Sequence, residues 1–167
     1  MLKHIVLVAS LLVVAMGIAA AGDMTKAATG SAPMEAMKAE MAKCTVCKIM
    51  VPHMDELAPM KMEVVKLTNG VALMHMVDSP AKATKLHAVC KEMSTAGESC
   101  LTMTDEQAKT QLCENCQEMR SVIKAGATMG VGDTKMGDIM VFTSNDPAVQ
   151  AKINTMGEKC ALMAAGM

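Results

Sequence analysis

The stretch Cys44-Thr-Val-Cys47-Lys-Ile-Met50 occurs twice in this chain, the second time in altered form as Cys113-Glu-Asn-Cys116-Gln-Glu-Met119. Downstream of each copy a turn, an apolar run and a polar residue followed by Pro also recur. The segment from Asn69 to Pro80 matches the segment from Met136 to Pro147 at a constant, slightly smaller offset. Self-similarity at a fixed spacing indicates a repeated structural unit. The sequence therefore predicts an internal duplication, with two residues gained or lost in the loop after each Cys pair.

Each half predicts the order helix, strand, strand, helix. Asn69-Gly70 separates two apolar runs, and this dipeptide supplies the positive φ angles of a tight hairpin turn. Ser79-Pro80 and Asp146-Pro147 each combine an N-cap residue with Pro at the first helical position, which is typical of helix starts. Because one hairpin is too small to be stable alone, we expect both hairpins to merge into one antiparallel sheet with helices packed on it, an α+β fold.

The Cys pairs are expected inside the opening helix of each half. The first such helix is predicted over residues 31–51. The second is predicted over residues 104–125, where Thr104 and Gln107 have the spacing of a capping box. On this prediction Cys113 lies in the middle of its helix, far from the positive end of the helix dipole.

The N-terminus has the pattern of a secretory signal peptide: a basic start, an apolar run over residues 5–15 and the small residues Ala19-Ala20-Ala21. The run is short for a membrane span. We therefore expect an exported protein, periplasmic or extracellular, without a stable membrane anchor. The predicted organisation is a signal peptide (1–21), a flexible leader (22–32), a first repeat (33–93), a linker (94–103) and a second repeat (104–165), the two repeats forming one fused domain.

Composition narrows the classes of function. The formal net charge of −1 gives no basic surface for a nucleic acid. The sequence contains no Gly-x-Ser-x-Gly, no phosphate-binding loop and no His-Glu-x-x-His, so we predict a protein that is not an enzyme. It has 21 Met among 167 residues but a single aromatic residue, Phe142. Thioether side chains can fill a core in place of aromatic rings, and they are also ligands for soft ions such as Cu(I).

The paired Cys residues are the main candidates for metal ligands. Two Cys three positions apart on a helix project to one side, so their sulfur atoms can reach one ion or each other. Two thiolates and a thioether suit Cu(I), our first choice, whereas four thiolates from both pairs together suit tetrahedral Zn(II). The sequence leaves open whether the two pairs meet. The predicted ligand sets are Cys44, Cys47 and Met50, then Cys113, Cys116 and Met119, with His87 and Cys90 as second-rank candidates.

Two other interpretations of the seven Cys are open. In an exported protein they are expected to form disulfides, which would give a structural or binding module without a metal cofactor. A thiol–disulfide oxidoreductase is the third choice, because no strand precedes either pair and the predicted mid-helix position of Cys113 does not lower its thiol pKa. Seven is an odd number, so at least one Cys is free, ligating or paired between chains.

The stretch from Cys44 to Val51, followed by a hairpin ending at Pro80 and a helix, resembles NosL-type copper chaperones of nitrous oxide reductase assembly. That family has two homologous strand-strand-helix halves and binds Cu(I) through Cys and Met. The resemblance covers residues 44–93 and extends to residues 113–162. It implies that Cys47 and Met50 bind Cu(I) and that the partner is a metal-receiving protein. The family usually has Cys-x-Met, whereas here Met50 lies three residues after Cys47.

Overall fold

The computed structural model describes the backbone of residues 31–165 and the side chains of residues 34–162. The predicted signal peptide and most of the predicted leader lie outside these residues. Within the described range, no helix is both long enough and apolar enough to cross a membrane. The elements are α1 (Ser31–Lys43), the 3-10 helices η1 (Cys47–Ile49) and η2 (Val51–His53), α2 (Met54–Leu57), β1 (Lys61–Leu67), β2 (Gly70–Met76), α3 (Pro80–Cys100), α4 (Asp105–Gln111), α5 (Glu114–Lys124), β3 (Thr128–Thr134), β4 (Gly137–Thr143) and α6 (Pro147–Ala165).

The two hairpins form one four-stranded antiparallel sheet in the order β1-β2-β4-β3. At its centre β2 pairs with β4, and Leu73 lies opposite Met140, its own counterpart in the second half. The residues on either side of this pair are related in the same way, as an approximate twofold axis through the junction requires. The predicted merged sheet and the α+β fold are confirmed.

Two glycines allow the strands of the two halves to approach. A Cβ atom added to Gly70 would lie 1.8 Å from the Phe142 carbonyl oxygen, and one added to Gly137 would lie 1.7 Å from the His75 carbonyl oxygen. Any larger residue would push β2 and β4 apart, so only Gly fits where each hairpin turn meets the other half. Each of these two Gly residues thus allows the strands of the two halves to pair, in addition to its place in the hairpin turn.

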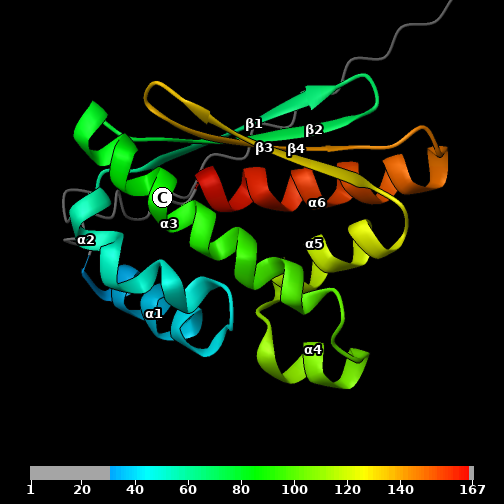
Figure 1. The fold of residues 1–167 in the computed structure, drawn as a ribbon, viewed down its shortest axis with the longest axis horizontal. Helices are drawn as coiled ribbons and strands as arrows, with labels where there is room; N and C mark the ends of the chain where they lie inside the picture. The colour runs from blue at the N-terminus through cyan, green and yellow to red at the C-terminus, as the bar shows by residue number, and fades with distance from the viewer. Residues whose placement is uncertain (1–30, 166–167) are drawn as a thin grey trace, which may run out of the picture. The chain divides into compact units, whose positions relative to one another are not determined.

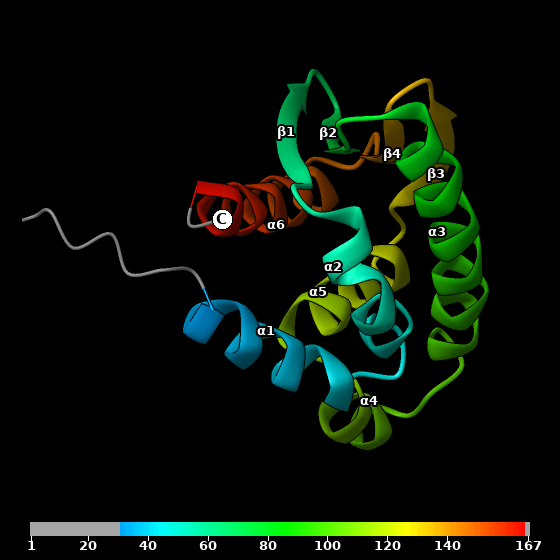
Figure 2. The same cartoon turned by 90° about the vertical axis from the view of Figure 1, so that its left-hand side faces the viewer.

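The closing helices α3 and α6 pack on the same face of the sheet (Figures 1 and 2). Helix α6 contacts β1 and β2, which belong to the first half, while α3 contacts β4 of the second half. The closing helix of each half therefore covers strands of the other half, so the two halves share one core. The main core cluster consists of Val71, Leu73, Val122, Ala127, Phe142, Val149, Ile153, Met156 and Cys160.

The predicted helix caps are present at both closing helices. The Ser79 hydroxyl accepts a hydrogen bond from the Lys82 N–H (3.3 Å), and Asp146 accepts one from the Ala148 N–H (2.7 Å). Helix α3, however, runs to Cys100 and includes most of the segment predicted as a linker. Its hydroxyl groups hydrogen-bond within the helix, for example Thr95 to the carbonyl of residue 91. The real connection to the second half therefore spans only residues 101–104.

The opening helices are shorter than predicted. Helix α1 ends at Lys43, and the first Cys pair lies in a turn and the 3-10 helix η1. In the second half the predicted helix is divided, because Leu112 and Cys113 adopt extended backbone angles between α4 and α5. The 3.6-residue apolar pattern continues across this break, since Leu112 turns inward into the core around the Cys residues. The prediction that Cys113 lies mid-helix is therefore wrong: it is the N-cap of α5.

Candidate metal centre

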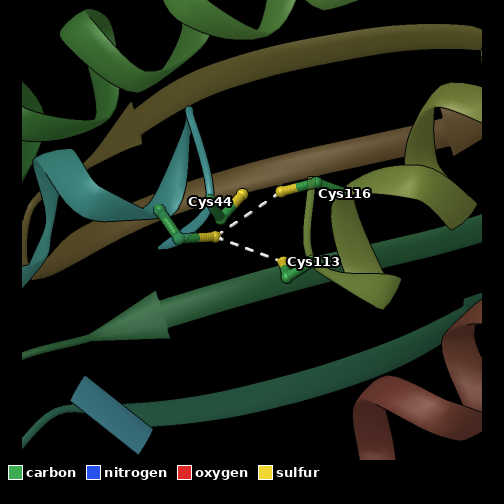
Figure 3. Close-up of side chains that lie close together, drawn as sticks. Cys44, Cys113 and Cys116 are labelled. Carbon is green, nitrogen blue, oxygen red and sulfur yellow. Dashed lines mark hydrogen bonds between the residues drawn. The ribbon is translucent and has the colours of Figure 1, made fainter. Parts of the chain in front are cut away.

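Four sulfur atoms converge where the two halves meet. The Sγ atoms of Cys44, Cys47, Cys113 and Cys116 all lie within 4.8 Å of one another. Cys47 Sγ is 3.6 Å from Cys113 Sγ and 3.5 Å from Cys116 Sγ. Figure 3 shows the labelled Cys44, Cys113 and Cys116 pointing toward a common centre. In a tetrahedral site with Zn–S bonds of about 2.3 Å, neighbouring sulfurs are roughly 3.8 Å apart. The four thiols have nearly this spacing, so both Cys pairs belong to one site.

Local backbone hydrogen bonds hold the two Cys turns side by side. The Lys48 N–H donates to the Cys44 carbonyl (3.0 Å), which closes the first Cys-x-x-Cys turn. The Gln117 N–H donates to the Cys113 carbonyl (3.0 Å), which closes the second. Between the halves, the Thr45 N–H donates to the Gln111 carbonyl (2.9 Å), so the loop after α1 is tied to the end of α4. The cluster is thus fixed by backbone geometry on both sides.

The four thiols are electrostatically unequal. Hydrogen bonding to Cys113 lowers the pKa of Cys44, and hydrogen bonding to Cys116 lowers the pKa of Cys113 to about 7. The hydrogen bonds with Cys113 raise the pKa of Cys47 and of Cys116 instead. Above pH 7 the cluster therefore favours thiolates at Cys44 and Cys113 and protonated thiols at Cys47 and Cys116. Thiolate is the form that binds metals, so an ion entering this site has to displace the two remaining protons.

An apolar shell surrounds the cluster. Cys44 is 1 % exposed, whereas Cys47, Cys113 and Cys116 are half-buried. The residues that pack around the four thiols are Val46, Met93, Ala96, Cys100, Met103, Ala108 and Leu112. Such a shell excludes water from one side of the site, and the half-buried thiols leave the other side open to an entering ion.

Arg120, the only Arg of the chain, supports this shell. Its side chain is 8 % exposed, and its Nε donates to the Cys100 carbonyl (2.9 Å). Its guanidinium also donates to the Met103 carbonyl and forms an ion pair with Asp105 (2.8 Å). Arg120 therefore anchors the connection between α3 and α4 beside the cluster. Sequence reasoning missed this residue, although a solitary Arg one helical turn after Cys116 was a visible signal.

The two Met residues of the repeated motif lie elsewhere. Met50 is 6 % exposed in a core cluster with Leu57 and Val77, and Met119 packs against the main core. The four Cys of the two predicted Cys-Cys-Met sets thus lie in one group, while the two Met residues lie in other core clusters. His87 and Cys90, the second-rank candidates, also lie outside the four-cysteine group, on α3.

The structure also bears on the two other interpretations of the Cys. All seven are free thiols, and none lies at bonding distance from another in the part of the chain that the structure describes. Cys113 is the N-cap of α5, a position that favours a thiolate, so its placement does not count against redox chemistry. Both Cys pairs nevertheless face the same point, and this arrangement suits a metal site with four ligands better than a single redox-active Cys pair.

The fold and the site define this chain by themselves: a duplicated α+β domain with a four-cysteine cluster between its halves. No protein-family model, no curated protein and no solved structure matches it.

Proposed function

We propose that this chain is an exported, non-enzymatic metal-binding protein that holds one thiophilic ion with Cys44, Cys47, Cys113 and Cys116. The observation that carries the proposal is the convergence of these four Sγ atoms, two from each half, within 4.8 Å. Export rests on the signal-peptide pattern of residues 1–21.

Zn(II) fits this donor set best. Four thiolates in a closed tetrahedral arrangement are typical of structural zinc sites, and the Sγ separations of 3.5 and 3.6 Å are close to the edge of a zinc–thiolate tetrahedron. Because each half supplies two ligands, the ion links the two halves of the duplicated fold. Structural zinc contributes its binding energy directly to folding, so the metal would stabilise the whole domain.

Cu(I) is the second candidate, and one observation favours it. Met93 and Met103 pack against the core cluster that contains the four cysteines, and soft sulfur ligands select Cu(I). Together with half-buried thiols, they would provide a path for an exchangeable ion that passes to a receiving protein. The resemblance to NosL-type chaperones supports this candidate, but its predicted ligand Met50 lies in another core cluster.

Metal analysis of the reduced protein tests the proposal. After dialysis against Zn(II) or anaerobic Cu(I), the chain should retain one tightly held ion that a chromophoric chelator removes slowly. Cys47→Ser and Cys113→Ser should each abolish this tight binding. Cys160→Ala, which changes a buried thiol in the main core, is the matched control and should keep it. Wild-type protein that loses all metal to the chelator would contradict the proposal.

A further inference from the structure

A second group of chemically active side chains lies between α3 and the sheet. His75 on β2 and Asp138 on β4 are cross-strand partners, and His75 Nδ1 is 2.9 Å from Asp138 Oδ1. Cys90 on α3 lies near the Asp138 carboxylate, and burial together with this carboxylate raises the pKa of its thiol. His87, one turn earlier on α3, is 2.7 Å from the Gly137 carbonyl oxygen through Nε2. Three elements thus bring two imidazoles, a thiol and a carboxylate to one place.

The duplication supplies an internal control for this group. At the equivalent positions of the other half, the cross-strand pair His75–Asp138 is replaced by the pair Phe142–Val71. Cys90 corresponds to Gly157, whose position packs directly on Val71, and His87 corresponds to Asn154. Phe142 and Val71 are fully buried core residues. The fold therefore needs no polar group at this place, because the same architecture is completed by an apolar pair in the other half.

Burying a carboxylate is unfavourable unless its charge is compensated. The Asp138 side chain is 7 % exposed and the His75 side chain 20 % exposed. Burial raises the pKa of Asp138, but hydrogen bonds with His75 and Cys90 outweigh it and leave the pKa below its usual value. Burial and the neighbouring Asp138 raise the pKa of the Cys90 thiol. A cation at this place would compensate the buried carboxylate and release the thiol proton.

One nitrogen of each imidazole contacts an oxygen acceptor, a feature shared with known metal sites. A metal-binding His normally donates one ring N–H to a carboxylate or a backbone carbonyl and binds the ion with the other nitrogen. His75 has its Nδ1 on the Asp138 carboxylate, and His87 has its Nε2 on the Gly137 carbonyl. The Nδ1 of His87 faces Asp133 Oδ2 at 3.9 Å. Each ring is thus held by an acceptor through one nitrogen, and the second nitrogen of His87 binds an ion only when the Asp133 carboxylate moves aside.

We propose that His75, His87, Cys90 and Asp138 form a second metal site, separate from the four-cysteine centre, for a borderline divalent ion such as Zn(II) or Co(II). Mixed nitrogen, sulfur and oxygen ligands suit this class of ion. Among the described residues, only the four-cysteine group has all its ligand atoms within 4.8 Å. Binding at the second site therefore requires rotation of side chains around Asp138 and is weaker than at the first.

Equilibrium dialysis against Zn(II), with bound metal measured by mass spectrometry, tests the second site. Wild-type protein should bind two equivalents, one tight and one weaker. The variant His75→Phe/Asp138→Val with Cys90→Gly copies the apolar pair of the other half together with Gly157, whose missing side chain makes room for Val71, and it should bind one. His87→Asn copies the counterpart Asn154 at a half-exposed position, so it should fold normally and weaken the second equivalent at least tenfold.

Cys47→Ser/Cys113→Ser removes the first site and separates the two proposals. It should lose the tight equivalent and keep the weaker one, and retention of the weaker one does not depend on the four-cysteine proposal. Wild-type protein that binds a single equivalent, lost in this variant, would overturn the second site. Two equivalents of unchanged affinity in His87→Asn and in the variant that copies the other half would overturn it as well.

Discussion

Zinc affinity at the four-cysteine centre should fall steeply as the pH is lowered. The perturbation is a change from pH 8 to pH 6 in reducing buffer. Above pH 7, Cys44 and Cys113 are already thiolates because their pKa values are lowered, that of Cys113 to about 7. Cys47 and Cys116 are protonated because their pKa values are raised. Binding then releases two protons. Below pH 7, Cys113 is protonated as well, and binding releases three.

The size of the effect follows from the proton count. Each released proton changes the affinity about tenfold per pH unit, equivalent to about 1.4 kcal/mol. The affinity for Zn(II) should therefore fall roughly 100-fold from pH 8 to pH 7, and roughly 1,000-fold from pH 7 to pH 6. The affinity falls as the pH is lowered, because protons compete with the ion for the same sulfurs.

Competition with a chromophoric zinc chelator at each pH, corrected for the protonation of the chelator, measures this slope. Calorimetry in buffers of different ionisation enthalpy counts the released protons independently. Cys160→Ala is the matched variant, because it removes a buried thiol of the main core, leaves all four ligand thiols in place and should show the same slope. An affinity that changes less than tenfold between pH 8 and pH 7 would refute the proposed sharing of protons among the four thiols.

Four further predictions concern the fold and the residues around the site. Arg120→Ala should lower the free energy of unfolding by about 2 kcal/mol in urea denaturation, because the buried Cys100 carbonyl and the half-buried Met103 carbonyl lose their donor; an unchanged midpoint would contradict the anchoring role. Gly137→Ala should destabilise the domain by about 3 kcal/mol or more, since the added Cβ overlaps a backbone oxygen. Gly97→Ala meets nothing within 4 Å on α3 and should stabilise it by up to about 1 kcal/mol in the same assay. Met50→Leu and Met119→Leu should leave Zn(II) affinity within about threefold of wild type, because neither residue packs in the cysteine cluster. A larger loss of affinity in either variant would show that its thioether binds the ion.

The duplication was the part of the fold that could be predicted best from sequence. One constant offset relates the two hairpins and both closing helices, and it reappears in the pairing of Leu73 with Met140. Gly and Pro at fixed places carried this signal, because turns and helix starts depend on local backbone chemistry. The packing of α3 and α6 on strands of the opposite half depends on tertiary contacts, so no local sequence pattern predicts it.

The site was harder to predict than the fold. The residues Cys44, Cys47, Cys113 and Cys116 were identified, but their meeting at one point depends on the break at Leu112, where extended angles interrupt a continuous helical pattern. Periodicity cannot detect such a break, because the inward-turning residue still falls on the apolar face. The second polar group was detectable in principle, since the duplication makes Asp138 the counterpart of a buried Val71 in the other half.

X-ray absorption at the zinc edge, on protein loaded with one equivalent of Zn(II), tests the central claim most directly. The account predicts a shell of four sulfur atoms at about 2.3 Å, and loss of one or more of them in Cys47→Ser. A shell containing nitrogen or oxygen ligands at about 2.0–2.1 Å in the wild-type protein would contradict the four-thiolate site.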